Sequence, residues 1–213
     1  MKNNKISYAI TGCNEHAELE QLLYFLIDEI RNEDEIVVVT DESNTSQKVI
    51  ELLCHIQEQE THLNFHWWEH PLNKDFAKQK NFLNSKCNED FIFQIDADEI
   101  PHTNLIRFLP ELLDENHDTE AYWIPRINTV EGITEEHIKR WGWTVDYKGW
   151  VNFPDWQMRI YKNNVDIKWT KPVHEQLIGY KQYTQLPPTE EWCLYHHKEI
   201  KRQEKQNEFY NAI

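Results

Sequence analysis

The chain has 213 residues, of which 39% are hydrophobic and 13% aromatic, so it suits one globular domain and is not intrinsically disordered. Its formal net charge of −15 disfavours nucleic acid or an anionic membrane surface as a broadly bound partner. Because only five glycines are present, no glycine-rich phosphate loop of the dinucleotide or P-loop type can be placed on it.

The first half alternates predicted strands with predicted helices. Apolar or β-branched runs predict strands at residues 6–11, 36–40, 63–68 and 91–95. Apolar residues at helical spacing predict helices between them, at residues 19–30, 46–55 and 74–85. This order predicts an α/β fold with a mostly parallel, Rossmann-like sheet flanked by helices.

The second half is less regular. A helix is predicted at residues 103–113 and a charged helix at 199–209, with strands at 121–127, 157–161 and 165–169. Residues 129–154 are rich in Trp, Gly and charge and are predicted to form a loop or lid. No repeat or linker divides the sequence, so we expect a single domain over residues 1–213.

Three carboxylates lie within Asp96-Ala97-Asp98-Glu99, directly after the fourth predicted strand. Because side chains alternate along an extended strand, Asp96 and Asp98 are predicted to point to the same side. Two carboxylates on one side suit Mg²⁺ or Mn²⁺, especially where a substrate phosphate completes the ligand shell. The alternative is a solvated acidic turn.

Acidic side chains also follow the first and second predicted strands, at Glu15 and Asp41. The carboxyl ends of parallel strands lie along one edge of a sheet, where open α/β sheets bind ligands. Asp41 is therefore a candidate to accept hydrogen bonds from a base or ribose, with a turn-forming Asp as the alternative. The convergence of acids from separate parts of the chain favours a binding site.

Six segments resemble motifs of family 2 glycosyltransferases with the GT-A fold. They are Ile10–Glu15, Val38–Ser43, Ala77–Asn81, Ile95–Glu99, Phe153–Tyr161 and Val173–Glu175. The last, Val-His-Glu, resembles that of bacterial lipopolysaccharide-type members. The resemblance covers most of the chain and implies a nucleotide-sugar-binding half at residues 1–100 and an acceptor-binding half at 101–213.

The resemblance implies an inverting, metal-dependent transferase. A sugar would pass from a nucleotide-diphosphate donor, expected to be a UDP-sugar, to a hydroxyl of a glycan, lipid-linked or other acceptor. The implied donor-site residues are Thr11, Glu15, Asp41, Lys80 and Asp96. Asp98 would hold Mn²⁺ or Mg²⁺ against the diphosphate, and Asp96 would reach the ion or the ribose. His174 and His196 are the candidates for a further metal ligand.

Two carboxylates compete for the role of the base that takes the acceptor's proton. The first candidate is Asp155, in the segment Phe153–Tyr161, and the second is Glu175. The alternative for Asp155 is a structural Asp at the entry to a strand or helix. The alternative for Glu175 is an ion pair with Lys171 or Arg159.

Two further groups of side chains are candidates for ligand contact. An aromatic cluster predicted to stack on acceptor sugars, or to form a small satellite core, consists of Trp141, Trp143, Tyr147, Trp150 and Trp156. A basic stripe on the last helix, interpreted as a solvated face or as a grip on diphosphate or an anionic acceptor, consists of Lys198, Lys201, Arg202 and Lys205.

Two other functions stay open. A nucleotidyltransferase usually has a glycine-rich basic loop after its first strand, which this sequence lacks. A non-catalytic nucleotide- or glycan-binding module is disfavoured by the presence of Asp96, Asp98 and Asp155. The scattered cysteines, with no predicted signal region or membrane span, predict a cytoplasmic protein, and peripheral attachment at the inner membrane face is left open.

Overall fold

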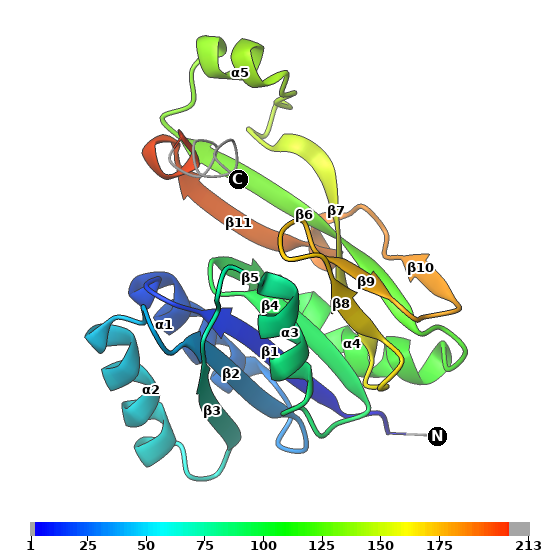
Figure 1. Ribbon diagram of the computed structural model, residues 1–213. Coiled ribbons are helices and arrows are strands. Elements are labelled where there is room, and N and C mark those ends of the chain that lie inside the picture. Colours follow the sequence, from blue (N-terminus) through cyan, green and yellow to red (C-terminus); the bar gives the residue numbers. More distant parts are fainter. Residues whose placement is uncertain (1–2, 205–213) are drawn as a thin grey trace.

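Four parallel strands form the first half of the central sheet in the computed structural model, which describes residues 3–204 (Figure 1). They are β1 (Ile6–Gly12), β2 (Glu35–Asp41), β3 (Asn64–His70) and β4 (Phe91–Asp96). They pair in the order β3-β2-β1-β4. The connecting helices are α1 (His16–Glu29), α2 (Gln47–Gln59) and α3 (Phe76–Asn84). The predicted alternation of strands and helices is confirmed.

Strands of the second half extend the same sheet. β7 (Val151–Lys162) lies antiparallel to both β4 and β6 (Ala121–Glu131). β11 (Leu194–Glu199) runs parallel to β6 and antiparallel to β5 (Glu99–Pro101). The smaller elements are α4 (Thr103–Glu115), β10 (Tyr183–Gln185), which pairs with β6, the 3-10 helix η1 (Glu190–Trp192) and a hairpin of β8 (Lys168–Thr170) and β9 (Gln176–Ile178).

Alternating side chains on the central strands supply two apolar layers. Tyr8 and Ile10 of β1 pack with apolar residues of α1, α2 and α4 on one face. Ala9 of β1 packs on the other face, with residues of α3 and with Trp169 and Leu177 of the β8–β9 hairpin. Because both faces are covered, β2 is buried along its whole length, and its carboxyl end lies where a ligand can be enclosed.

Residues 129–154 are more ordered than the predicted loop. β6 continues to Glu131, β7 already begins at Val151, and between them lies α5 (Glu135–Trp141). The strand predicted at 157–161 is therefore only the second half of β7, whose first half accommodates Pro154 beside a register shift between β6 and β7. We call residues 132–150 the arm; α5 lies at its tip, beyond the rest of the sheet (Figure 1).

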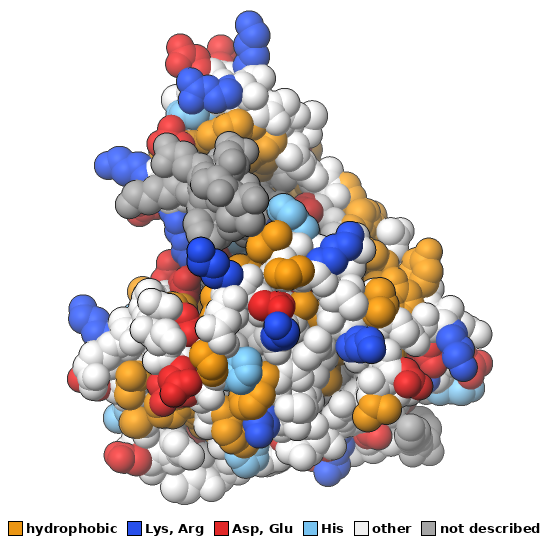
Figure 2. Space-filling view, viewed as in Figure 1, with side chains coloured by type: hydrophobic (Ala, Val, Ile, Leu, Met, Phe, Trp, Pro, Cys, Tyr) orange, Lys and Arg blue, Asp and Glu red, His pale blue; other side chains and the backbone are white. Residues whose placement is uncertain are grey.

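The arm exposes charged side chains at its end and hydrophobic side chains nearer the sheet (Figure 2). No residue of α5 is buried, and acidic side chains in its first turn and basic ones in its last favour the helix dipole. Trp141 and Trp143 have ring centroids 4.6 Å apart. Tyr147 of the predicted aromatic cluster is 94% exposed, so the cluster is partly a surface feature and not simply part of the core.

The last described segment is helical over residues 200–204, and the rest of the helix predicted at 199–209 lies outside the described residues. The strand expected at 165–169 is shorter and later, at β8. Among the helices of residues 3–204, none combines the length and apolar character needed to cross a bilayer.

Candidate active site

A cavity of about 1020 Å³ lies at the carboxyl ends of the parallel strands. Thr11 and Asp41 line it from the ends of β1 and β2, and Asp96 lines it from the end of β4. Nine of the ten predicted site residues line this cavity: Thr11, Glu15, Asp41, Lys80, Asp96, Asp98, His174, Glu175 and His196. The tenth, Asp155, is not among the lining residues.

Asp41 is fixed by hydrogen bonds at the end of β2. Its carboxylate accepts from the backbone N–H groups of Ser43 (3.2 Å) and Leu72 (3.1 Å) and from Asn44 Nδ2 (2.7 Å). Burial acts to raise the pKa of Asp41, but these donors outweigh it and the pKa is lowered. A carboxylate offers about four acceptor positions, so one remains for a base or ribose donor.

Glu15 shapes the turn after β1. Its Oε2 accepts from the backbone N–H groups of Cys13 (3.0 Å) and Asn14 (2.9 Å), and its Oε1 lies 3.7 Å from Arg202 Nη2. Thr11 lines the cavity from near the end of β1, four residues before Glu15. Both predicted donor-site residues are therefore held at the cavity wall by local structure.

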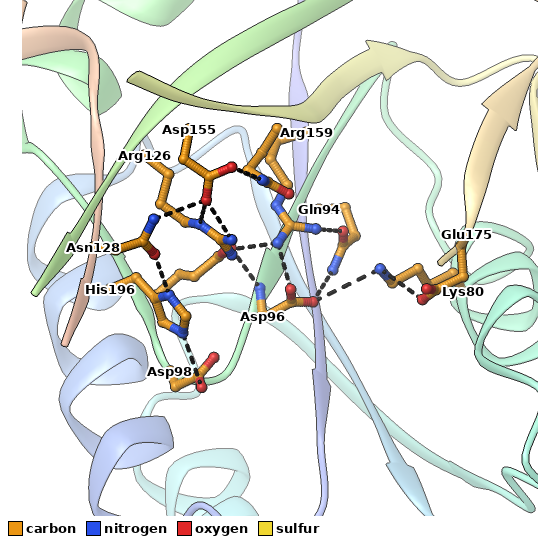
Figure 3. Close-up of polar contacts among 12 residues, drawn as sticks. Lys80, Gln94, Asp96, Asp98, Arg126, Asn128, Asp155, Arg159, Glu175 and His196 are labelled. Atoms are coloured by element: carbon orange, nitrogen blue, oxygen red, sulfur yellow. Dashed lines mark hydrogen bonds and ion pairs between the residues drawn. The ribbon is translucent and has the colours of Figure 1, made fainter. Parts of the chain in front are cut away.

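Asp96 is held by a buried arginine that the sequence did not single out as a site residue (Figure 3). Arg159 of β7 donates through Nη2 to Asp96 and to Glu99 Oε1 (2.6 Å), and through Nη1 to Gln94 Oε1 (2.6 Å). Burial acts to raise the pKa of Asp96, but the charges of Arg159 and Lys80 hold the pKa well below its usual range. Asp96 is therefore an oriented anion before any ligand arrives.

A second arginine joins this cluster to Asp155. Arg126 Nη1 donates to Glu99 Oε1 at 2.8 Å, while its Nε and Nη2 donate to Asp155 Oδ2 at 2.9 and 2.6 Å. Glu99 is fully buried between the two guanidinium groups. It forms a structural bridge there, which its position beside Asp98 in the sequence did not reveal.

Asp155 accepts four hydrogen bonds in all. Besides the two from Arg126, Asn128 Nδ2 donates to its Oδ2 (2.8 Å) and Gln157 Nε2 donates to its Oδ1 (2.9 Å). Burial acts to raise the pKa of Asp155, but the charge of Arg126 and these donors lower it. A carboxylate so occupied is a poor proton acceptor, since an effective base needs a pKa near the working pH.

Glu175 enters the cavity from the turn between β8 and β9. Its Oε1 lies 3.1 Å from Lys80 Nζ, which also lies 3.9 Å from Asp96 Oδ1 and 4.7 Å from the ring centroid of Trp169. The ion-pair partner is Lys80, and not Lys171 or Arg159. Lys80 thus joins a predicted donor-site carboxylate to a predicted base.

His196 and Asp98 face each other on the opposite side of Asp96 from Glu175 (Figure 3). His196 Nδ1 lies 2.7 Å from Asn128 Oδ1, and the amide nitrogen of Asn128 donates to Asp155. Asn128 must therefore present its oxygen to His196, so Nδ1 carries a proton and Nε2 is the ring nitrogen that faces Asp98. This Nε2 lies 3.3 Å from Asp98 Oδ2.

The spacing of these two atoms fits a divalent cation. Neighbouring ligands of an octahedral ion with bonds of about 2.1 Å are about 3.0 Å apart. His196 also makes the hydrogen bond from its other ring nitrogen that metal-binding histidines usually make. Within residues 3–204 no third His, Cys, Asp or Glu completes a three-ligand group, so His174 lines the cavity without joining this pair.

Sequence reasoning missed Arg126, Asn128 and Arg159 as parts of the site. A signal was present: Asp155, Gln157 and Arg159 alternate along β7, as Arg126 and Asn128 do along β6. Polar residues with a period of two mark one face of a strand. Their partners follow from the pairing of Arg126 with Asp155 across the strands, which the sequence alone did not indicate.

Solved structures with similar folds include a fragment of S. aureus TarS in complex with UDP and with UDP-GlcNAc. These have TM-scores of 0.64 and 0.65 and 15% and 16% sequence identity, covering 91% of this chain and 60% and 58% of the TarS chains. A mannosyltransferase from Pyrobaculum calidifontis in complex with GDP-Man and Mn²⁺ has a TM-score of 0.51 and 17% identity over 59% of this chain and 36% of its own. The likeness confirms the predicted GT-A-like α/β fold.

A search of curated proteins returned no match. The sequence profile described as glycosyl transferase family 2, in contrast, matches residues 7–198, which is nearly the whole chain. This match confirms the predicted family and enzyme class. The chain belongs to glycosyl transferase family 2.

Proposed function

We propose that this chain transfers a sugar from a nucleotide-diphosphate donor to an acceptor hydroxyl, with inversion and with help from a divalent cation. The observation that carries the proposal is the cavity at the carboxyl ends of the strands, with Asp98 Oδ2 and His196 Nε2 lying 3.3 Å apart at its wall. Bound UDP-GlcNAc in TarS, and GDP-Man with Mn²⁺ in the mannosyltransferase, support a donor of this class.

Asp98 and His196 would hold Mn²⁺ or Mg²⁺, and donor phosphate oxygens and water would complete the shell. The ion, when bound, neutralises the diphosphate as it leaves. Asp41 accepts a hydrogen bond from the nucleoside, and we propose a UDP-sugar as the donor. Asp96, kept anionic by Arg159, accepts from a ribose or sugar hydroxyl.

We assign the base to Glu175, which reverses the order suggested by the sequence. Inversion in one displacement needs the base on the side of the sugar away from the leaving diphosphate. Glu175 lines the cavity and lies across Asp96 from Asp98 and His196 (Figure 3). Asp155, in contrast, does not line the cavity and has four donors of its own.

The acceptor end of the cavity runs from Thr129 and Val130 to Asn152 and Trp143. Indole rings suit the apolar C–H faces of sugars, so we propose that Trp143 contacts a glycan or glycolipid acceptor. The four cysteines are free thiols, which supports the cytoplasmic location that we expect.

The test is UDP or GDP release from a panel of UDP-sugars and GDP-Man, with Mn²⁺, Mg²⁺ or EDTA and water as acceptor. We expect one donor to be hydrolysed with a metal and not with EDTA, and NMR to detect the inverted anomer first. Release of pyrophosphate from a nucleoside triphosphate would favour a nucleotidyltransferase. Tight donor binding without any turnover would favour a non-catalytic module.

A further inference from the structure

Arg202 contacts Asp98, the carboxylate that is predicted to bind the metal ion. Its Nη2 lies 3.2 Å from Asp98 Oδ2, the same oxygen that faces His196. Nη1 donates to Glu18 Oε1 of α1 at 2.9 Å, and Nη2 also lies 3.7 Å from Glu15 Oε1. One guanidinium thus joins the last described helical segment to α1 and to the turn that follows β4.

Arg202 differs from the other two arginines of the cluster in its freedom to change partners. Arg159 is buried and the Arg126 side chain is only 18% exposed, and both are bonded to carboxylates that stay in the network. The side chain of Arg202 is 37% exposed and lines the cavity beside the proposed diphosphate position. Its other partners, Glu15 and Glu18, are also partly exposed, so its contacts can be exchanged without opening the core.

A cation and Arg202 would compete for Asp98. An ion bonded to Asp98 Oδ2 at about 2.1 Å lies at most about 5.3 Å from the Arg202 nitrogen, which is 3.2 Å from the same oxygen. Two positive groups this close repel, and the single negative charge of Asp98 that they would share does not neutralise a divalent cation and a guanidinium together. A diphosphate supplies the further negative charge, and arginine binds phosphate oxygens in the same forked geometry as carboxylates.

We propose that Arg202 stays ion-paired with Asp98 until the donor arrives and then binds the donor diphosphate beside the divalent cation. This inference rests on the proposed function. The cation and the nucleotide therefore bind cooperatively. The cation alone must displace Arg202, whereas with the diphosphate present Arg202 exchanges one anion for another. Such coupling is reciprocal: each ligand raises the affinity of the other by the same factor.

The experiment titrates Mn²⁺ into the protein with and without UDP, using the electron paramagnetic resonance signal of free Mn²⁺. In Arg202→Gln we expect Mn²⁺ alone to bind about tenfold more tightly than in the wild type, since one repelling charge is lost. The factor by which UDP raises Mn²⁺ affinity should fall about tenfold. Arg202→Lys, which keeps the charge, should retain the weak binding of Mn²⁺ alone.

Arg107→Gln is the matched control, because Arg107 pairs with Glu29 (2.9 Å) on the surface and does not line the cavity. It removes the same charge and should leave both affinities unchanged. The inference is overturned if Arg202→Gln binds Mn²⁺ alone no more tightly than Arg107→Gln while UDP still promotes Mn²⁺ binding to the wild type. If the wild type binds no Mn²⁺ even with UDP, the proposed function itself fails.

Discussion

Substituting each of the two candidate bases in turn distinguishes a catalytic role from a structural one. In Glu175→Gln the ion pair with Lys80 becomes a hydrogen bond from the Lys80 ammonium to a neutral amide oxygen, and Lys80 keeps Asp96 at 3.9 Å. We expect the free energy of unfolding to fall by only about 1 kcal/mol. Without its base, the enzyme should release UDP from the donor about 10²–10⁴-fold more slowly, because the attacking hydroxyl keeps its proton.

Asp155→Asn should lower the free energy of unfolding more than Glu175→Gln does and slow UDP release less. The substitution removes the negative charge that Arg126 pairs with, and it replaces a carboxylate that accepts from both Arg126 and Asn128 with an amide that has one acceptor oxygen. Removing one partner of a buried pair costs about 3–5 kcal/mol. Because the Asp155 side chain is 29% exposed and Arg126 keeps Glu99, we expect a loss of about 2–3 kcal/mol.

The assays are urea unfolding followed by circular dichroism, and metal-dependent UDP release from the donor with water as acceptor. Calorimetric titration with UDP and Mn²⁺ should give wild-type affinity in Glu175→Gln, which separates lost chemistry from lost binding. The reasoning is refuted if Asp155→Asn keeps wild-type stability and loses UDP release while Glu175→Gln releases UDP at the wild-type rate. Asp155 would then be the base.

Three other changes test separate parts of the site. Arg159→Met removes the buried partner of Asp96 and Glu99 and should lower the free energy of unfolding by about 3–5 kcal/mol in urea, whereas a loss below about 1 kcal/mol would contradict the network. Asn128→Ala frees the His196 ring and should weaken Mn²⁺ binding in the presence of UDP about 10–100-fold, as seen in a Mn²⁺ titration; unchanged affinity would contradict the assigned tautomer. Trp143→Ala should raise the KM for any saccharide that accelerates UDP release, without changing hydrolysis of the donor, and an unchanged KM would remove the arm from the acceptor site.

The parts of the site that sequence predicted best lie directly after strands. Asp41 and Asp96 follow apolar runs, so the parallel-sheet rule places them at one edge without knowledge of side-chain contacts. The same rule could not assign roles to Glu99 and Arg159. Those roles depend on the pairing of β4 with β7 and of β6 with β7, which joins residues about 30 to 65 positions apart.

The irregular half was harder to predict because its elements depend on tertiary context. The arm carries a helix with no buried residue, so no apolar periodicity marks α5 in the sequence. The sequence marks α5 only by its two capping residues. The Thr134 side chain accepts a hydrogen bond from the backbone N–H of His137 at the start of the helix, and Gly142 ends the helix with a φ of 65°. The partner of Glu175 was missed for a similar reason, since Lys80 lies on α3, far away in sequence.

The central claim is that Asp98 and His196 hold a divalent cation against the donor diphosphate. The most direct measurement is anomalous diffraction at the manganese edge from crystals grown with UDP and Mn²⁺. We predict one strong peak about 2.2 Å from both Asp98 Oδ2 and His196 Nε2, and in contact with UDP phosphate oxygens. Bound UDP with no anomalous peak at this pair, or with the peak at other residues, would contradict the account.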